Sequence, residues 1–103
     1  MNHEDALKQF FDAENRRDWT AYIAFLHPDV EWVLFGRSET LMIQGIEEAY
    51  TGNNDSFSCE TLYSGVSGSR ITAVLRNNHG QRSTEIFEFE NGLIRKEWEF
   101  LLG

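Results

Sequence analysis

Polar and apolar residues alternate along residues 83–101, on both sides of an Asn91-Gly92 pair. An Asn-Gly pair between two alternating segments is a strong signal for a β-hairpin, because both residues tolerate a positive φ. The simplest pairing across this turn places Glu85 opposite Trp98, and opposite residues share one face of the sheet. The more apolar of the two faces then consists of Glu85, Phe87, Phe89, Ile94, Lys96, Trp98 and Phe100. We expect this face to be buried, which places a carboxyl group among aromatic rings.

Alternation also predicts strands earlier in the chain, at residues 56–65, 69–77 and 82–90. The second of these has an apolar set that belongs on the face of the buried carboxyl group, made of Ile71, Ala73 and Leu75. A further strand begins at Asp29 and is apolar on both faces, so we expect both faces to be covered. Residues 40–44 can form a short return strand beside it.

The N-terminal part of the chain shows helical spacing instead. Two residues there have side chains that favour a helix N-terminus, Asn2 and Asp18. The first predicted helix reaches Arg17 and carries a stripe of Ala6, Leu7, Phe10, Phe11 and Glu14. The second is predicted to run to Leu26 and to end before Pro28, because a residue that precedes proline avoids the helical region. A brief third helix is predicted over residues 45–52.

Helices followed by a run of sequential strands predict an α+β fold. The expected architecture is a cone-shaped, curved antiparallel sheet of about five to six strands packed against three helices. A length of 103 residues predicts a single domain over residues 1–103. A bent sheet covered by helices leaves a conical interior, which is a common place for a small-molecule site.

Charge and composition exclude several classes of function. The net charge is −8 and no cluster of Lys and Arg is present, so neither nucleic acid nor an anionic membrane is an expected partner. The polar, acidic N-terminus does not resemble a signal peptide, and no apolar run is long enough to span a membrane. We therefore expect a cytoplasmic protein.

Metal and cofactor sites have little support in the sequence. Cys59 is the single cysteine, which excludes an internal disulfide and a Cys-rich zinc site. The three histidines are far apart and form no His-x-x-His pair. A glycine-rich phosphate loop and a serine nucleophile elbow are both missing. The sequence therefore predicts neither a metal nor a cofactor.

Three segments resemble the SnoaL-like / nuclear transport factor 2-like superfamily. Residues 18–32 resemble the second helix of that family running into its first strand, and residues 44–49 resemble its "G-x-E-A" third helix. Residues 85–98 resemble its closing pattern "D-x-x-R-F-x-x-G-K-I-x-x-x-W". The resemblance spans nearly the whole chain. It implies a nuclear transport factor 2-like cone, and a homodimer that forms through the outer face of the sheet.

The superfamily includes ketosteroid isomerases, polyketide cyclases, epoxide hydrolases, dehydratases and non-catalytic binding modules. The general base of the ketosteroid isomerases falls at Leu34 and their tyrosine donor at about Phe10, and neither residue can move a proton. Their second acid falls at Glu85, where the polyketide-cyclase branch also has its acid/base residue. The arginine that usually follows three positions later is Glu88 here. The resemblance therefore implies that Glu85 is the remaining acid or base.

Glu85 is accordingly the candidate catalytic residue. A carboxyl group in apolar surroundings has a raised pKa, so it can donate to a carbonyl or act as a base. A salt bridge to Lys96 or Arg70 would lower that pKa, and a bulge in the strand would turn the side chain to solvent; in either case Glu85 would be structural instead. The candidate ligand contacts are Phe10, Tyr22, Trp32, Leu34, Tyr63, Phe87, Lys96 and Trp98.

Two functions remain open from the sequence. The first is an enzyme of isomerase, cyclase or hydrolase type that acts through Glu85 on a small, largely apolar molecule. The second is a non-catalytic dimeric module whose cavity sequesters an apolar ligand or is filled by side chains.

Overall fold

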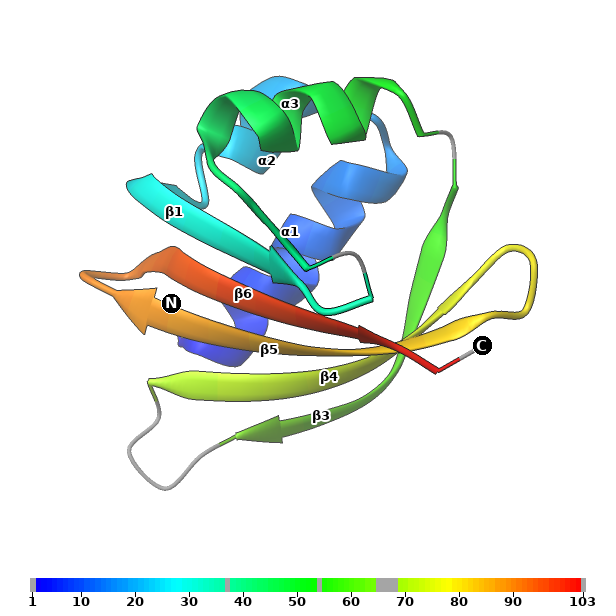
Figure 1. Cartoon of the computed structure of the whole chain (residues 1–103). Helices are drawn as coiled ribbons and strands as arrows, with labels where there is room; N and C mark the ends of the chain where they lie inside the picture. Colours follow the sequence, from blue (N-terminus) through cyan, green and yellow to red (C-terminus); the bar gives the residue numbers. More distant parts are fainter. Residues whose placement is uncertain (1, 37, 54, 65–68, 103) are drawn as a thin grey trace.

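The computed structural model describes residues 2–36, 38–53, 55–64 and 69–102. Its helices are α1 (His3–Asn15), α2 (Trp19–Ile23) and α3 (Ile43–Thr51). Its strands are β1 (Leu26–Leu34), β2 (Glu39–Leu41), β3 (Phe57–Ser64), β4 (Arg70–Asn77), β5 (Arg82–Glu90) and β6 (Leu93–Leu101). The strands form one sheet in the order β2-β1-β6-β5-β4-β3 (Figure 1).

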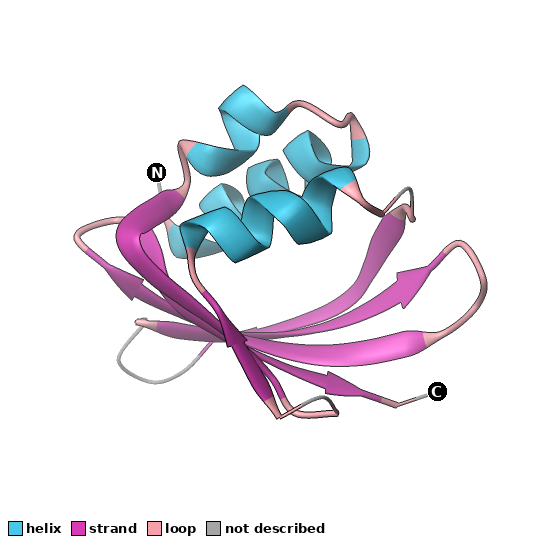
Figure 2. Ribbon diagram, turned by 45° about the horizontal axis from the view of Figure 1, so that its top comes forward, coloured by secondary structure: helices cyan, strands magenta, loops and turns pink. Residues whose placement is uncertain are grey.

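The sheet is strongly curved, and the three helices lie on its concave side (Figure 2). Strands β3 to β6 pair in sequence and antiparallel, as predicted. Strand β1, however, pairs antiparallel with β2 and parallel with β6, so the sheet is mixed. The predicted α+β fold with a curved sheet is therefore confirmed, with the correction that the β1–β6 pair is parallel in an otherwise antiparallel sheet. A parallel pairing leaves no local signal in the sequence, because β1 and β6 are separated by most of the chain.

Two side chains fix the starts of the first two helices, as their sequence positions predict. The Asn2 Oδ1 atom accepts a hydrogen bond of 2.8 Å from the Asp5 backbone N–H. The Asp18 Oδ1 atom accepts one of 3.1 Å from the Ala21 N–H. Both bonds satisfy N–H groups that have no partner inside the helix. Among the helices of the described residues, none is long and apolar enough to cross a membrane.

Helix α2 is shorter than predicted, because it ends at Ile23 and Leu26 already belongs to β1. The Phe25 carbonyl accepts a hydrogen bond of 2.8 Å from the Ile94 N–H, which joins this corner to β6. The β1–β6 ladder then shifts register between Leu26 and Glu31. Pro28 lies within this irregular stretch, where its missing N–H costs no regular ladder bond.

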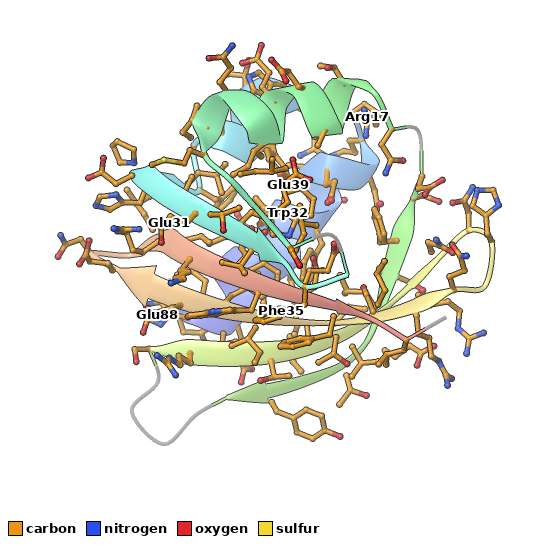
Figure 3. The ribbon with its side chains drawn as sticks, in the orientation of Figure 1. Arg17, Glu31, Trp32, Phe35, Glu39 and Glu88 are labelled. Carbon is orange, nitrogen blue, oxygen red and sulfur yellow. The ribbon has the colours of Figure 1, made fainter. Side chains whose placement is uncertain are left out.

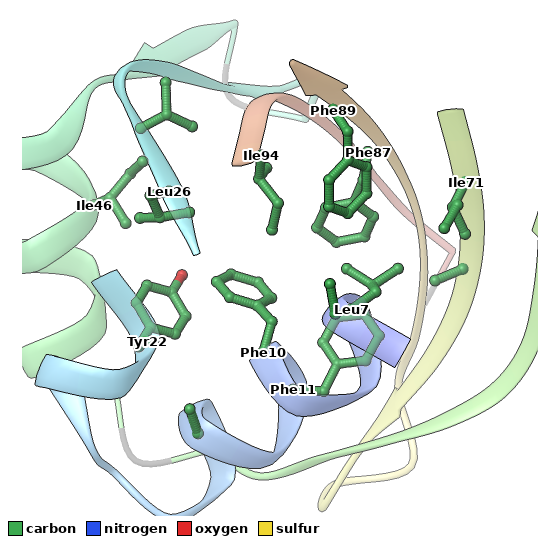
Figure 4. Packing of buried hydrophobic residues seen from close by; sticks show 14 of the residues in the cluster. Leu7, Phe10, Phe11, Tyr22, Leu26, Ile46, Ile71, Phe87, Phe89 and Ile94 are labelled. Atoms are coloured by element: carbon green, nitrogen blue, oxygen red, sulfur yellow. The ribbon is translucent and has the colours of Figure 1, made fainter. Parts of the chain in front are cut away.

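The core lies between α1 and the concave face of the sheet. Its largest fully buried side chains are Leu7, Val30, Ile46, Ile71, Phe87 and Ile94. Figure 4 shows Phe10 between Tyr22 and Phe87, with ring centroids 4.4 Å and 6.2 Å away. The predicted apolar set of β4 is confirmed, because Ile71, Ala73 and Leu75 are all buried there.

A β-bulge in the β5–β6 hairpin changes which side chains of β6 face the interior. The turn is as predicted, with positive φ at Asn91 and Gly92. Beyond the pair Phe89–Ile94 the register shifts, and Glu88 pairs with Lys96. Arg95 is therefore the extra residue on β6, and an extra residue reverses the face of every side chain that follows it.

After the bulge, Glu85 lies opposite Glu99 and Phe87 lies opposite Glu97. The predicted pairing of Glu85 with Trp98 is therefore wrong, since Trp98 lies opposite Ile86 on the outer face. The sheet presents two glutamates of its last strand to the concave side, in place of a lysine and a tryptophan.

Candidate functional site

A cavity of about 770 Å³ opens between the C-terminal half of α1, helix α3 and the curved sheet. Its polar lining includes four glutamates from three elements, Glu14 on α1, Glu85 on β5, and Glu97 and Glu99 on β6. Its apolar lining includes Phe10, Phe11, Leu34, Ile46, Leu75 and Phe87. The hollow interior predicted from the order of elements is therefore present, but its wall is far more acidic than predicted.

Glu85 lies in the middle of β5 between Ala73 and Glu99 on the neighbouring strands. Only 7% of its surface is exposed. Burial raises the pKa of its carboxyl group well above the ordinary value, and Glu99, Glu97 and Glu14 raise it further. The side chain also forms a hydrogen bond with the carboxyl group of Glu99. The prediction that Glu85 is buried is confirmed, and its role as an acid or base stays a prediction.

Glu97 is buried more deeply, with 4% of its surface exposed. It lies between Trp32 on β1 and Phe87 on β5. Burial raises its pKa well above the ordinary value, and the charges of Glu14 and Glu99 act in the same direction. Among the described residues, its Oε1 atom has no hydrogen-bond partner.

Glu14 comes from the last turn of α1 and faces the same cavity. Burial and the nearby Glu99 raise its pKa to about 7, although the guanidinium of Arg17 lowers it. Arg17 donates a hydrogen bond to the Tyr50 carbonyl and lies 4.1 Å from the centre of the Tyr50 ring. In Figure 3 this arginine is seen beside the C-terminal end of α3.

Two tyrosines form the wall of the cavity on the side of the helices. The rings of Tyr22 and Tyr50 lie 4.9 Å apart, and Trp19 packs against both. Burial raises the pKa of Tyr22 well above its ordinary value, and Glu97, Glu14 and Glu85 contribute. The Tyr50 hydroxyl and the Trp32 Nε1 atom have no hydrogen-bond partner among the described residues. Polar atoms that lack partners in a cavity wall mark it as a place where a ligand can bind.

Five of the predicted ligand contacts line the cavity together with Glu85: Phe10, Tyr22, Trp32, Leu34 and Phe87. Three others lie elsewhere. Tyr63 is 62% exposed on β3, which is one of the two edge strands of the described sheet. Lys96 and Trp98 lie on the outer face, because the bulge at Arg95 reverses their direction.

The contacts of the outer-face residues agree with this correction. The Lys96 Nζ atom is 3.5 Å from a carboxylate oxygen of Glu31 and 5.1 Å from the centre of the Trp98 ring. The Arg70 guanidinium lies 5.3 Å from the same ring. Figure 3 views the molecule from this side, with Glu31 and Glu88 labelled. Lys96 therefore cannot neutralise Glu85, and the alternative of a Glu85–Lys96 salt bridge is wrong.

Three residues that sequence reasoning did not select complete the acidic cluster. Glu14 stood in the apolar stripe of the first helix, four positions after Phe10, and a carboxyl group at such a position is a usable signal. Glu97 and Glu99 gave no such signal, because the simplest hairpin register points both of them outward.

The cluster can hold or transfer protons. A carboxyl group with a raised pKa donates a hydrogen bond when protonated and is a stronger base than usual when ionised. Among the described residues, no group of three or more His, Cys, Asp or Glu side chains has an arrangement that could hold a metal ion. The residues of the cavity are thus equipped for acid–base chemistry or for binding by hydrogen bonds and charge.

The sequence matches no protein-family model and no curated protein. Its structure resembles many solved structures, among them a proposed ketosteroid isomerase from Kribbella flavida, with a TM-score of 0.85, 18% identity, and coverage of 98% of this chain and 78% of the other. A SnoaL-like protein of unknown function from Burkholderia thailandensis has a TM-score of 0.84 and 16% identity, over 98% and 94% of the two chains.

A third similar structure is that of TerC co-crystallised with polyporic acid, with a TM-score of 0.79 and 18% identity over 96% and 90% of the two chains. Others are described as nuclear transport factor 2-like or as having a cystatin-like fold. These similarities confirm the nuclear transport factor 2-like cone that the sequence predicts. At such low identity they establish the fold alone.

Proposed function

We propose that this protein binds a small, largely apolar organic molecule in the cavity, and that Glu85 transfers a proton to or from that molecule. The observation that carries the proposal is the position of Glu85, a buried carboxyl group in the cavity wall that is hydrogen-bonded to Glu99. When protonated, it can donate a hydrogen bond to a ligand carbonyl. When ionised, it can remove a proton from an adjacent carbon. Isomerases, cyclases and hydrolases all need such a group.

The remaining wall supports an apolar ligand with rings. The side chains of Phe10, Trp32, Leu34 and Phe87 line the space beside Glu85. Pockets for drug-sized molecules commonly measure about 300–1,000 Å³, and the cavity volume of about 770 Å³ falls in that range. TerC, which shares this fold, was co-crystallised with polyporic acid.

An assay of proton removal from the carbon next to a carbonyl group tests the proposal. The probe is 2-tetralone, a bicyclic ketone with exchangeable α-protons, incubated with the protein in deuterated buffer and followed by proton NMR. We expect the protein to accelerate deuterium incorporation, and Glu85→Gln to reduce that acceleration on the order of 100-fold or more, since general acid–base groups contribute this much. Binding of the ketone should persist in the variant, because glutamine keeps the shape of the side chain.

The control is Glu88→Gln. Glu88 is a carboxylate of the same strand, but it lies on the outer face and accepts a hydrogen bond from Arg70. This variant should exchange deuterium at the wild-type rate. Failure of the protein to bind the ketone, or equal acceleration by Glu85→Gln, would overturn the proposal.

A second candidate function is a non-catalytic homodimeric binding module, and the outer face of the sheet favours it. Phe35 is 48% exposed and its ring stacks 4.4 Å from that of Phe100. Trp98 and Ile86 lie on the same face, beside the paired charges of Arg70 and Glu88. A mixture of apolar groups and paired charges suits a surface that binds a second copy. In this candidate the ketone binds without exchange. The dimer and the cytoplasmic location remain predictions.

A further inference from the structure

The charge of the cavity wall is strongly unbalanced. Four glutamates line it, and the cations among the described lining residues are Arg17 and Arg82. The Arg82 guanidinium lies 3.3 Å from a carboxylate oxygen of Glu60, which is not part of the lining. The Arg17 guanidinium is held by the carbonyl and the ring of Tyr50. The wall therefore holds more acidic than basic groups, and it can neutralise a positive charge as these carboxyl groups ionise.

Three buried polar atoms in this wall have no partner among the described residues. They are the Nε1–H donor of Trp32, the Oε1 atom of Glu97, 4% of whose surface is exposed, and the hydroxyl group of Tyr50, which is 9% exposed. Such groups are nearly always hydrogen-bonded in proteins, so their position in a cavity wall indicates a ligand atom that binds there. A carboxylate oxygen accepts hydrogen bonds, and a hydroxyl oxygen can accept one as well.

We infer that the ligand of this cavity is a protonated amine with an apolar body, whose ammonium group is bound by Glu97 and Glu14 beside the rings of Tyr22 and Tyr50. The inference rests on the proposed function, and it names the class of molecule that the same site binds. An ammonium group has three N–H donors and no acceptor, which matches the carboxyl groups. The Tyr50 hydroxyl oxygen, which has no partner among the described residues, can accept one of its hydrogen bonds. The apolar wall around Phe10 and Phe87 accommodates the body of the amine.

Binding of a cation must change the protonation of the wall. The groups that face the cluster are Glu14 and Arg17 from α1 and the residues after it, Asp18 and Tyr22 from α2 and its cap, Tyr50 from α3, Glu85 from β5, and Glu97 and Glu99 from β6. Carboxyl groups that hold protons in the empty cavity release them when an ammonium group arrives. The binding enthalpy of an amine should therefore depend on the ionisation enthalpy of the buffer.

Isothermal titration calorimetry with three matched probes tests the inference. The probes share one bicyclic body and differ in one group: 2-aminotetralin is cationic, 2-tetralol is neutral and tetralin-2-carboxylate is anionic. We expect the amine to bind at least about tenfold more tightly than the alcohol at neutral pH, with release of protons, and the carboxylate not to bind. Glu97→Gln should weaken binding of the amine by about tenfold and change the affinity for the alcohol by no more than about twofold.

Two further variants keep the test decisive. Glu14→Gln removes the second carboxyl group and should also weaken the amine, so it serves if Glu97→Gln does not fold. Glu88→Gln, on the outer face, should bind all three probes like the wild type. Equal or tighter binding of the alcohol, or an amine that binds without proton release, would overturn the inference and leave the proposed function standing. If neither the three probes nor 2-tetralone binds, the proposed function fails as well.

Discussion

Glu85 and Glu99 lie directly opposite each other on β5 and β6, and their carboxyl groups form a hydrogen bond within the cavity wall. Two carboxylates so placed repel each other when both are ionised, and a hydrogen bond between them requires that one holds a proton. Their titration therefore belongs to the pair rather than to either residue. This pair distinguishes the cavity wall from an ordinary apolar core, because it holds a proton that can be transferred to a molecule in the cavity.

Removal of one carboxyl group from this pair should stabilise the protein. At about pH 8 the carboxyl group of Glu85 is ionised in the unfolded chain. Folding must then either protonate this group or bury its charge, and Glu85→Gln avoids that free-energy cost. We expect the free energy of unfolding to rise by about 1–3 kcal/mol, measured by urea denaturation. The matched variant Glu88→Gln loses an exposed contact of 3.0 Å to Arg70 and should change stability by less than about 0.5 kcal/mol. Destabilisation of Glu85→Gln by more than about 1 kcal/mol would indicate an ionised, paired Glu85 instead.

The pKa of Glu14 predicts a pH dependence of stability. Its folded pKa of about 7 lies above the ordinary 4.5, so the folded state binds the proton more tightly than the unfolded state. The stabilisation is therefore fully present below about pH 4.5 and is lost as the pH rises through about 7, and it amounts to at most about 3 kcal/mol. Glu85 and Glu97 act in the same direction.

Urea denaturation at a series of pH values between about 5 and 8 measures this effect. The wild type should lose stability across the series, and Glu14→Gln should flatten the curve. Glu47→Gln, at an exposed position of α3, should leave the curve unchanged. A wild-type stability that rises from about pH 5 to about pH 8 would contradict the raised pKa values.

Phe87 belongs both to the cavity wall and to the core. Its truncation should lower the free energy of unfolding more than any other substitution proposed here. It is 1% exposed, and its ring lies 5.7 Å and 6.2 Å from those of Phe11 and Phe10. Phe87→Ala removes that packing and leaves a void, so we expect a loss of about 3–5 kcal/mol in the free energy of unfolding. Phe35→Ala at the half-exposed surface should cost about 1 kcal/mol or less. Equal losses in the two variants would contradict this position of the core.

The outer face predicts the oligomeric state. Sedimentation velocity should show the wild type as a dimer, and Trp98→Arg should convert it to a monomer, because a buried unpaired charge opposes association. Tyr63→Arg, on the exposed edge strand, should leave the dimer intact. A monomeric wild type at micromolar concentration would contradict the dimer and leave the cavity proposals untouched.

Much of the fold follows from local signals in the sequence, and the site follows only in part. The Asn91-Gly92 turn, the helix caps and the inward direction of Glu85 could each be inferred from neighbouring residues. The extra residue at Arg95 could not, because a strand that alternates in polarity offers two registers, and the apolar Trp98 favours the wrong one. The inward direction of two glutamates in place of a lysine and a tryptophan opposes the usual patterning, so no rule based on polarity selects it.

The pairing of strands that are far apart in the chain could not be inferred from the sequence either. The parallel contact between β1 and β6 brings Trp32 beside Glu97, and these two residues are far apart in the chain. These two residues therefore become neighbours only in the folded protein. The position of Glu14 in the apolar stripe of α1 could be read from the sequence, but the inward direction of Glu97 and Glu99 could not.

One backbone position decides the chemistry of the hollow. A regular ladder in which Arg95 paired with Glu88 would place Lys96 opposite Phe87 and Trp98 opposite Glu85, so that a lysine and an indole would replace two acids on the inner wall. The same strand sequence is thus compatible with an acidic cavity or with a basic, aromatic one, and the choice depends on whether the ladder bulges at Arg95. Gain or loss of a bulge beside the tight turn offers this scaffold a way to exchange the polarity of its ligands while the residues of the strand stay the same.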